Sequence, residues 1–142
     1  MESARAARMR AMLVVLCLLS ATACDESHIG PTVTLNERFT LAPGSVAVVR
    51  DEDVRVRFDE VTGDSRCPAD AVCIQGGDAL VHIRVSDGAS TNAYVLHTGD
   101  SNRAAIVHGT ARIALVELQP YPFSSRTIGP ADYRATFTVS RP

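Results

Sequence analysis

Apolar and polar side chains alternate with a period of two residues in three separate segments of the chain. The clearest is residues 54–59, where valine and phenylalanine alternate with arginine and aspartate, and the same period recurs in residues 79–85 and 133–140. Such alternation is typical of a β-strand with one face buried, because successive side chains point to opposite sides. We therefore predict three amphipathic strands.

Five weaker segments extend this pattern, and turn-forming residues fall between the segments at intervals of about ten. The weaker segments are residues 37–41, 45–50, 93–97, 104–107 and 111–118. No segment after residue 23 keeps a helical period, and Pro120 and Pro122 predict the end of a strand and a surface loop that reaches Pro130. The sequence predicts an all-β fold of seven to eight strands, a small antiparallel β-sandwich with a barrel as the alternative.

The first 23 residues have the composition of an export signal. Three arginines precede a short apolar run over residues 11–19, and Ala21 and Ala23 provide the small side chains that signal peptidase requires before Cys24. The apolar run is too short to span a bilayer. We predict a signal peptide over residues 1–23, a tether over residues 24–35 and one β-domain over residues 36–142.

The position of Cys24 resembles the bacterial lipobox, in which the first cysteine after cleavage receives acyl chains. The sequence departs from that pattern at Ala21, where leucine is usual. Two or three acyl chains anchor a protein stably, because each buried methylene contributes about 0.8 kcal/mol. The resemblance implies export and a lipid anchor in the bacterial cell membrane or outer membrane; a periplasmic or secreted protein is the alternative.

The remaining cysteines predict one disulfide. Cys17 leaves with the signal, and Cys67 and Cys73 enclose five residues, so an oxidising compartment should pair them. A redox role is less consistent with the spacing, since reactive pairs are usually Cys-x-x-Cys at a helix N-terminus. Removal of residues 1–23 takes three of the 14 basic and one of the 16 acidic residues, which leaves a net charge of −4 and disfavours nucleic acid as a partner.

Around these cysteines, residues 61–79 resemble a group of bacterial lipoproteins and secreted β-domains with no established activity. The matching positions run Asp-Ser-Arg-Cys-Pro from Asp64, then Val72, Cys73, Gly77 and Ala79, and the chain departs at Gln75, where tryptophan is common. The resemblance implies the location and the fold and supplies no chemistry. The same segment is a candidate binding loop, with five polar residues as its candidate contacts: Asp64, Ser65, Arg66, Asp70 and Gln75. A structural role for Asp64, Ser65 and Arg66, as caps and an ion pair of the loop, is the alternative.

No arrangement of histidines or serines matches a catalytic or metal motif. We expect His28 in the tether, His82 on a solvated strand face, His97 at a strand end and His108 in a turn; whether they converge on a metal is left open. The sequence predicts no cofactor and no catalytic residue. The expected function is that of a non-catalytic, lipid-anchored envelope module with a binding or structural role, and an envelope protein or a small ligand is its expected partner. The alternatives are a periplasmic metal-handling or redox protein and a secreted hydrolase inhibitor.

Overall fold

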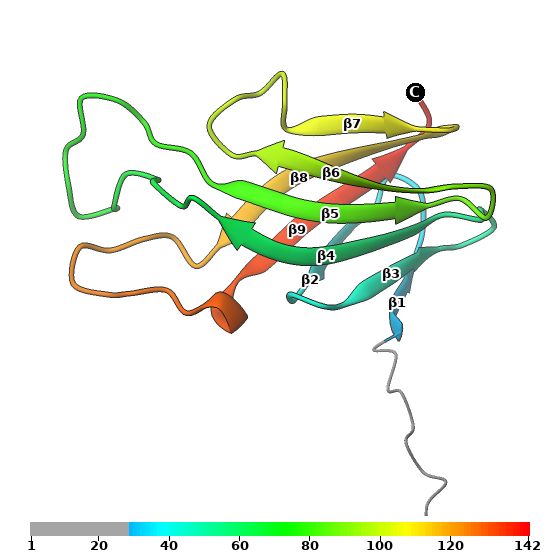
Figure 1. The fold of residues 1–142 in the computed structure, drawn as a ribbon, viewed down its shortest axis with the longest axis horizontal. Helices are drawn as coiled ribbons and strands as arrows, with labels where there is room; N and C mark the ends of the chain where they lie inside the picture. Colours follow the sequence, from blue (N-terminus) through cyan, green and yellow to red (C-terminus); the bar gives the residue numbers. More distant parts are fainter. Residues whose placement is uncertain (1–28) are drawn as a thin grey trace, which may run out of the picture.

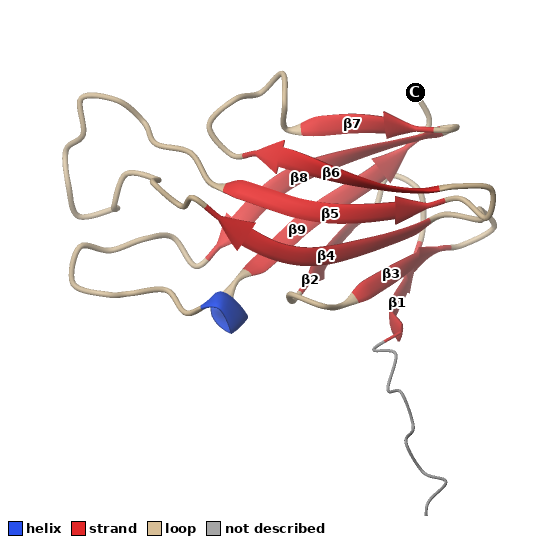
Figure 2. Ribbon diagram, in the orientation of Figure 1, coloured by secondary structure: helices blue, strands red, loops and turns tan. Residues whose placement is uncertain are grey.

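A computed structural model describes residues 29–142 as nine strands in two stacked sheets (Figures 1 and 2). The strands are β1 (Ile29–Val33), β2 (Arg38–Leu41), β3 (Val46–Val49), β4 (Arg55–Thr62), β5 (Leu80–Ser86), β6 (Thr91–His97), β7 (Ala105–His108), β8 (Ala111–Gln119) and β9 (Arg134–Ser140). The first sheet has the order β1-β3-β4-β5-β6 and the second β2-β9-β8-β7. All neighbouring strands are antiparallel except β1 and β3, and neither sheet closes on itself, so the predicted β-sandwich is confirmed and the barrel is not.

The strands follow the predicted segments closely. The three amphipathic segments form β4, β5 and β9, and the five weaker segments form β2, β3, β6, β7 and β8. β8 ends at Gln119, immediately before Pro120, because a proline cannot donate to the strand ladder. The only helical element among residues 29–142 is a 3-10 turn, η1 (Pro130–Asp132), just before β9.

β1 is a strand that the sequence did not predict, and it occupies Ile29–Val33 of the predicted tether. Its residues pair in parallel with β3, and the register shifts between Ile29 and Thr32. The glycine at position 30 permits this pairing, since a Cβ there would lie 2.3 Å from the carbonyl oxygen of Val46. The pattern did not predict β1 because Gly30 and Pro31 interrupt it; on an edge strand a proline leaves the inner ladder intact. Residues 24–28 of the predicted tether lie outside the described residues.

The core lies between the sheets and is centred on three phenylalanines. The Phe137 ring on β9 lies 6.0 Å from the ring of Phe39 and 6.2 Å from the ring of Phe58, measured between centroids. Phe58 and Phe137 are fully buried, so the two sheets meet at an aromatic contact. Among residues 29–142 no helix has the length and apolar character needed to cross a membrane.

Candidate binding site at the loop end

Two long loops project from the same end of the sandwich (Figure 1). We call residues 63–79, between β4 and β5, the disulfide loop, and residues 120–129, after β8, the proline loop. They are held to each other by hydrogen bonds: the Ala69 N–H donates to the Pro122 carbonyl over 2.9 Å, and the Ser124 N–H donates to Oδ1 of Asp70 over 2.9 Å. The Ser124 bond lowers the pKa of the Asp70 carboxyl. The loops therefore form one surface, which we call the loop end.

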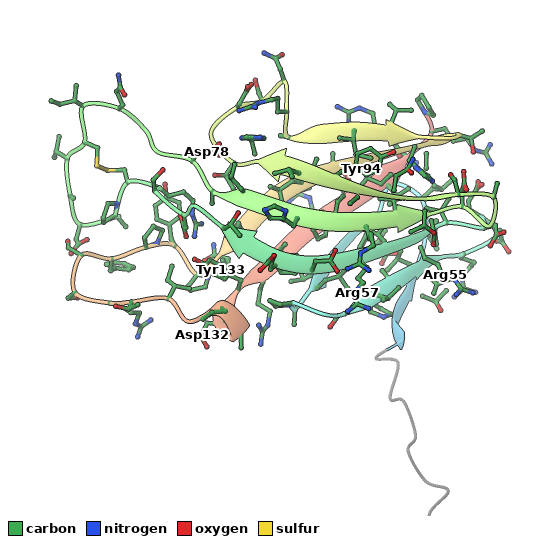
Figure 3. All side chains as sticks on the ribbon, viewed as in Figure 1. Arg55, Arg57, Asp78, Tyr94, Asp132 and Tyr133 are labelled. Atoms are coloured by element: carbon green, nitrogen blue, oxygen red, sulfur yellow. A yellow bond between two sulfur atoms is a disulfide. The ribbon has the colours of Figure 1, made fainter. Side chains whose placement is uncertain are left out.

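The predicted disulfide is confirmed and closes the disulfide loop. Cys67 and Cys73 are bonded, with their Cα atoms 6.0 Å apart, and the bond is visible in yellow in Figure 3. The bond fixes the part of the loop that lies farthest from the sheets, where residues 69–76 are all exposed.

Arg66 ties both loops to the sheet. Its guanidinium makes two bonds to the Asp64 carboxylate, of 2.9 and 2.8 Å, and donates to the carbonyls of Leu118 (2.6 Å) and Pro120 (3.0 Å). The residue is 7% exposed and lies over the Tyr121 ring, 5.5 Å from its centroid. Arg66 is thus a buried brace, which matches the structural alternative.

Asp64 is shared between Arg66 and Tyr133, which lies at the start of β9 (Figure 3). Burial acts to raise the pKa of Asp64, but the bonds from Arg66 and the Tyr133 hydroxyl (3.0 Å) outweigh it, so the pKa is lowered. Burial and the same contact with Asp64 raise the pKa of Tyr133 to about 12. The contacts explain why an acidic residue is stable beneath the loop end.

The other predicted loop residues divide into bonded and exposed positions. The Ser65 N–H and hydroxyl donate to the Asp78 carbonyl over 2.7 and 3.0 Å, and the Asp78 N–H donates to Oγ of Ser65 over 3.1 Å. These bonds join the two ends of the disulfide loop, so Ser65 acts as the predicted cap. Gln75 lies exposed on the loop.

Four apolar side chains that the sequence analysis did not single out are exposed on the loop end. Val72 and Ile74 on the disulfide loop are both 103% exposed, and Tyr121 and Phe123 on the proline loop are 49% and 47% exposed. Exposed residues adjoining turns carry no two-residue pattern, so the alternation did not predict that these two hydrogen-bonded loops expose apolar side chains. We call these four side chains the apolar rim.

A cleft of about 290 Å³ opens beside these loops, between the ends of the two sheets. Its lining includes Arg66 and Cys67, Gly76 and Gly77, His97 and Thr98, Ala104, the β8 residues Leu115, Val116, Glu117 and Leu118, and Tyr121. The sequence pattern did not predict it, because its walls come from three separate regions of the chain, residues 66–77, 97–104 and 115–121.

His97 is a buried histidine that lines the cleft. Its Nδ1 lies 2.6 Å from Oδ2 of Asp78, which Figure 3 places at the start of β5. Burial acts to raise the pKa of Asp78, but bonds from the Gly99 N–H, His97 and Thr98 outweigh it and lower the pKa to about 2. The ionised carboxylate accepts only, so Nδ1 carries a proton and donates to Asp78. The Arg103 guanidinium also only donates, so its Nη2, 3.0 Å from the same nitrogen, is a close contact and no hydrogen bond in this tautomer.

The histidines occupy separate environments. His97 ends β6 as predicted, whereas His108 is the last residue of β7 and is 3% exposed, with Nδ1 2.9 Å from the Tyr94 hydroxyl, rather than in a turn. His82 is half-buried, with Nε2 2.7 Å from Oγ1 of Thr62, rather than fully solvated. Within residues 29–142, no group of three or more histidine, cysteine or acidic residues is placed to hold a metal; His28 and Cys24 lie outside this range.

The comparisons with known proteins leave the function to be argued from this geometry. The resemblance drawn from residues 61–79 stays a prediction. No protein-family model, curated protein or solved structure matches the chain.

Proposed function

We propose that this protein is a non-catalytic, lipid-anchored module of the bacterial cell envelope that binds a partner protein through its loop end. The observation that carries the proposal is the apolar rim. Val72 and Ile74 are fully exposed on a loop that a disulfide closes and Arg66 braces, and such exposed apolar groups on a fixed loop are typical of an interaction surface.

Rigidity supports a binding role. A flexible loop loses conformational entropy when it binds, whereas the disulfide, the Arg66 bonds and the inter-loop bonds already hold this one in shape. Tyr121 and Phe123 add aromatic area, which is enriched in the energetically important parts of interfaces. The proposal of export and of a lipid anchor rests on residues 1–24, which have the pattern of an export signal followed by a lipidation site.

Site-directed photo-crosslinking in the native host tests the binding role. A photoreactive side chain at Val72 should give a discrete crosslinked species that disappears when Ile74→Asp is added, because a buried charge opposes an apolar interface. The matched control carries the same group at Ala93, an exposed position on β6 away from both loops. The same species from both positions, or none from Val72, would contradict the proposal.

Intact mass measurement of the protein isolated from host membranes tests the anchor separately. We expect the mass of residues 24–142 plus acyl chains and minus two hydrogens for the disulfide. A Cys24→Ser variant should leave the membrane fraction. An unacylated chain that starts at Cys24 would remove the anchor and leave the loop end as a surface of a secreted protein.

A further inference from the structure

The cleft lies where the second sheet has an incomplete edge. β7 has four residues and β8 has nine, so paired residues run only from Ala111 to Ala114, with one further bond of 2.8 Å from the Leu115 N–H to the Ala104 carbonyl. Within residues 29–142, no strand pairs with the rest of β8 on this side. The edge stays open as far as Leu118, whose carbonyl accepts from Arg66.

The open edge coincides with an irregularity in β8. The register with β9 shifts between Leu115 and Glu117, so Val116 is an extra residue opposite the partner strand. A bulge of this kind disrupts the ladder locally and redirects the strand, and bulges recur at sheet edges next to sites. Val116 is 40% exposed and lines the cleft.

On the side of the cleft away from β8, His97 offers a ring nitrogen for hydrogen bonding. Nδ1 of His97 donates to Asp78, and no buried side-chain nitrogen or oxygen in residues 29–142 lacks a hydrogen-bond partner. Nε2 of His97 has no hydrogen-bond partner within residues 29–142, so it is not one of the buried atoms. It is therefore open to solvent, on the side of the cleft that His97 lines. A neutral imidazole in this tautomer accepts at Nε2.

We propose that the cleft binds a short extended peptide segment, which continues the line of β7 along the open edge of β8. Its backbone pairs with the edge between Leu115 and Leu118, a small apolar side chain packs against Leu115, Leu118 and Tyr121, and an N–H donates to Nε2 of His97. Strand addition of this kind uses main-chain bonds for affinity and a pocket for selectivity.

The charges around the cleft favour a peptide over an anionic ligand. The Arg66 guanidinium, which is the cation in the lining, is already paired with Asp64 and with two carbonyls. Glu117 adds an acidic residue to the lining. The inference rests on the proposed function, because it names the kind of segment that the partner brings to the loop end.

The test is a titration of the processed protein, residues 24–142, with two peptides. The backbone amide resonances in an NMR spectrum report the binding. The probes are a capped tetrapeptide of alanines with one central valine and the same peptide methylated at every backbone nitrogen. We expect saturable shifts at Leu115–Leu118 from the first peptide and none from the second, which has no N–H to donate. Equal shifts from both peptides, or no saturable shift from the first, would overturn the inference.

Two variants locate the site. Gly76→Phe should abolish the shifts, because position 76 lines the cleft and a Cβ there meets no atom within 4 Å, so the fold tolerates the ring. His97→Ala should weaken binding about fivefold, the effect of one hydrogen bond of about 1 kcal/mol. The matched control is His82→Ala, on the outer face of β5. Unchanged affinity in Gly76→Phe would place the peptide elsewhere.

The result is separable from that of the proposed function. A Val72→Asp, Ile74→Asp variant should bind the tetrapeptide normally, since neither side chain lines the cleft. Peptide binding without a crosslink at Val72 would contradict the proposed function alone. A Val72 crosslink without peptide binding would contradict only the inference that the cleft binds a peptide.

Discussion

The Arg66 side chain makes several different contacts at once. It neutralises Asp64, donates to the carbonyls of Leu118 in β8 and of Pro120 just after β8, and covers an aromatic ring. The sequence offered an ion pair within the loop as one alternative for Asp64 and Arg66, which are two positions apart. It could not predict Leu118 and Pro120, which are 52 and 54 residues away and meet Arg66 only after both sheets have formed.

Arg66→Met should destabilise the protein by about 3 kcal/mol, because it leaves the Asp64 carboxylate buried without its cation. The free energy of unfolding in urea measures the loss. The control is Arg66→Met with Asp64→Leu, which removes both charges and should be more stable than the single variant. A double variant that is less stable than Arg66→Met would show that the ion pair is not the source of the effect.

Asp78 should make the domain acid-sensitive. Its pKa in the folded state is about 2, against an ordinary value of 3.8, so its contribution to stability is present above pH 3.8 and is lost as the pH falls toward 2. We expect the free energy of unfolding to fall by on the order of 2 kcal/mol over this window. Chemical denaturation at several pH values measures this loss. Asp78→Asn should flatten that part of the profile; a wild-type stability that does not change between pH 4 and about 2 would contradict the expectation.

The strands show which elements a pattern can predict. β4, β5 and β9 are central strands with one buried face, and their alternation was sufficient to predict them. β1 was missed because it joins the edge of the sheet by backbone pairing, with Val33 as its buried side chain. The loop end was predicted only as far as its disulfide and its polar residues, since the cleft and the apolar rim depend on contacts between distant segments.

The neighbouring glycines of the disulfide loop should respond in opposite ways to substitution. A Cβ at Gly77 would lie 1.5 Å from the Ser65 carbonyl oxygen, whereas one at Gly76 meets nothing within 4 Å. Gly77→Ala should therefore cost more than about 2 kcal/mol or prevent folding, and Gly76→Ala should be within about 0.5 kcal/mol of the wild type. Thermal unfolding of both variants measures this. Equal melting temperatures would show that the loop closes differently.

The two sheets should unfold together, because their aromatic contact is shared. Phe137 touches Phe39 in its own sheet and Phe58 in the other. Phe137→Ala should cost about 3–5 kcal/mol and keep one transition by both fluorescence and circular dichroism. Phe123→Ala, at an exposed position, is the control and should have little effect on stability. Separate transitions for the two probes would mean that the sheets are independent units.

If Cys24 carries the proposed anchor, the short segment between Cys24 and β1 limits how far from the membrane the protein can bind a partner. The first residue of the strand, Ile29, follows Cys24 by five positions, and five extended residues span at most roughly 17 Å. An acylated Cys24 would therefore keep β1 close to the membrane, and the disulfide loop and the proline loop project from the sandwich away from β1 (Figure 1). The protein would then sample only a shallow layer next to the bilayer, so its partner would be a membrane protein or one that comes to the membrane surface.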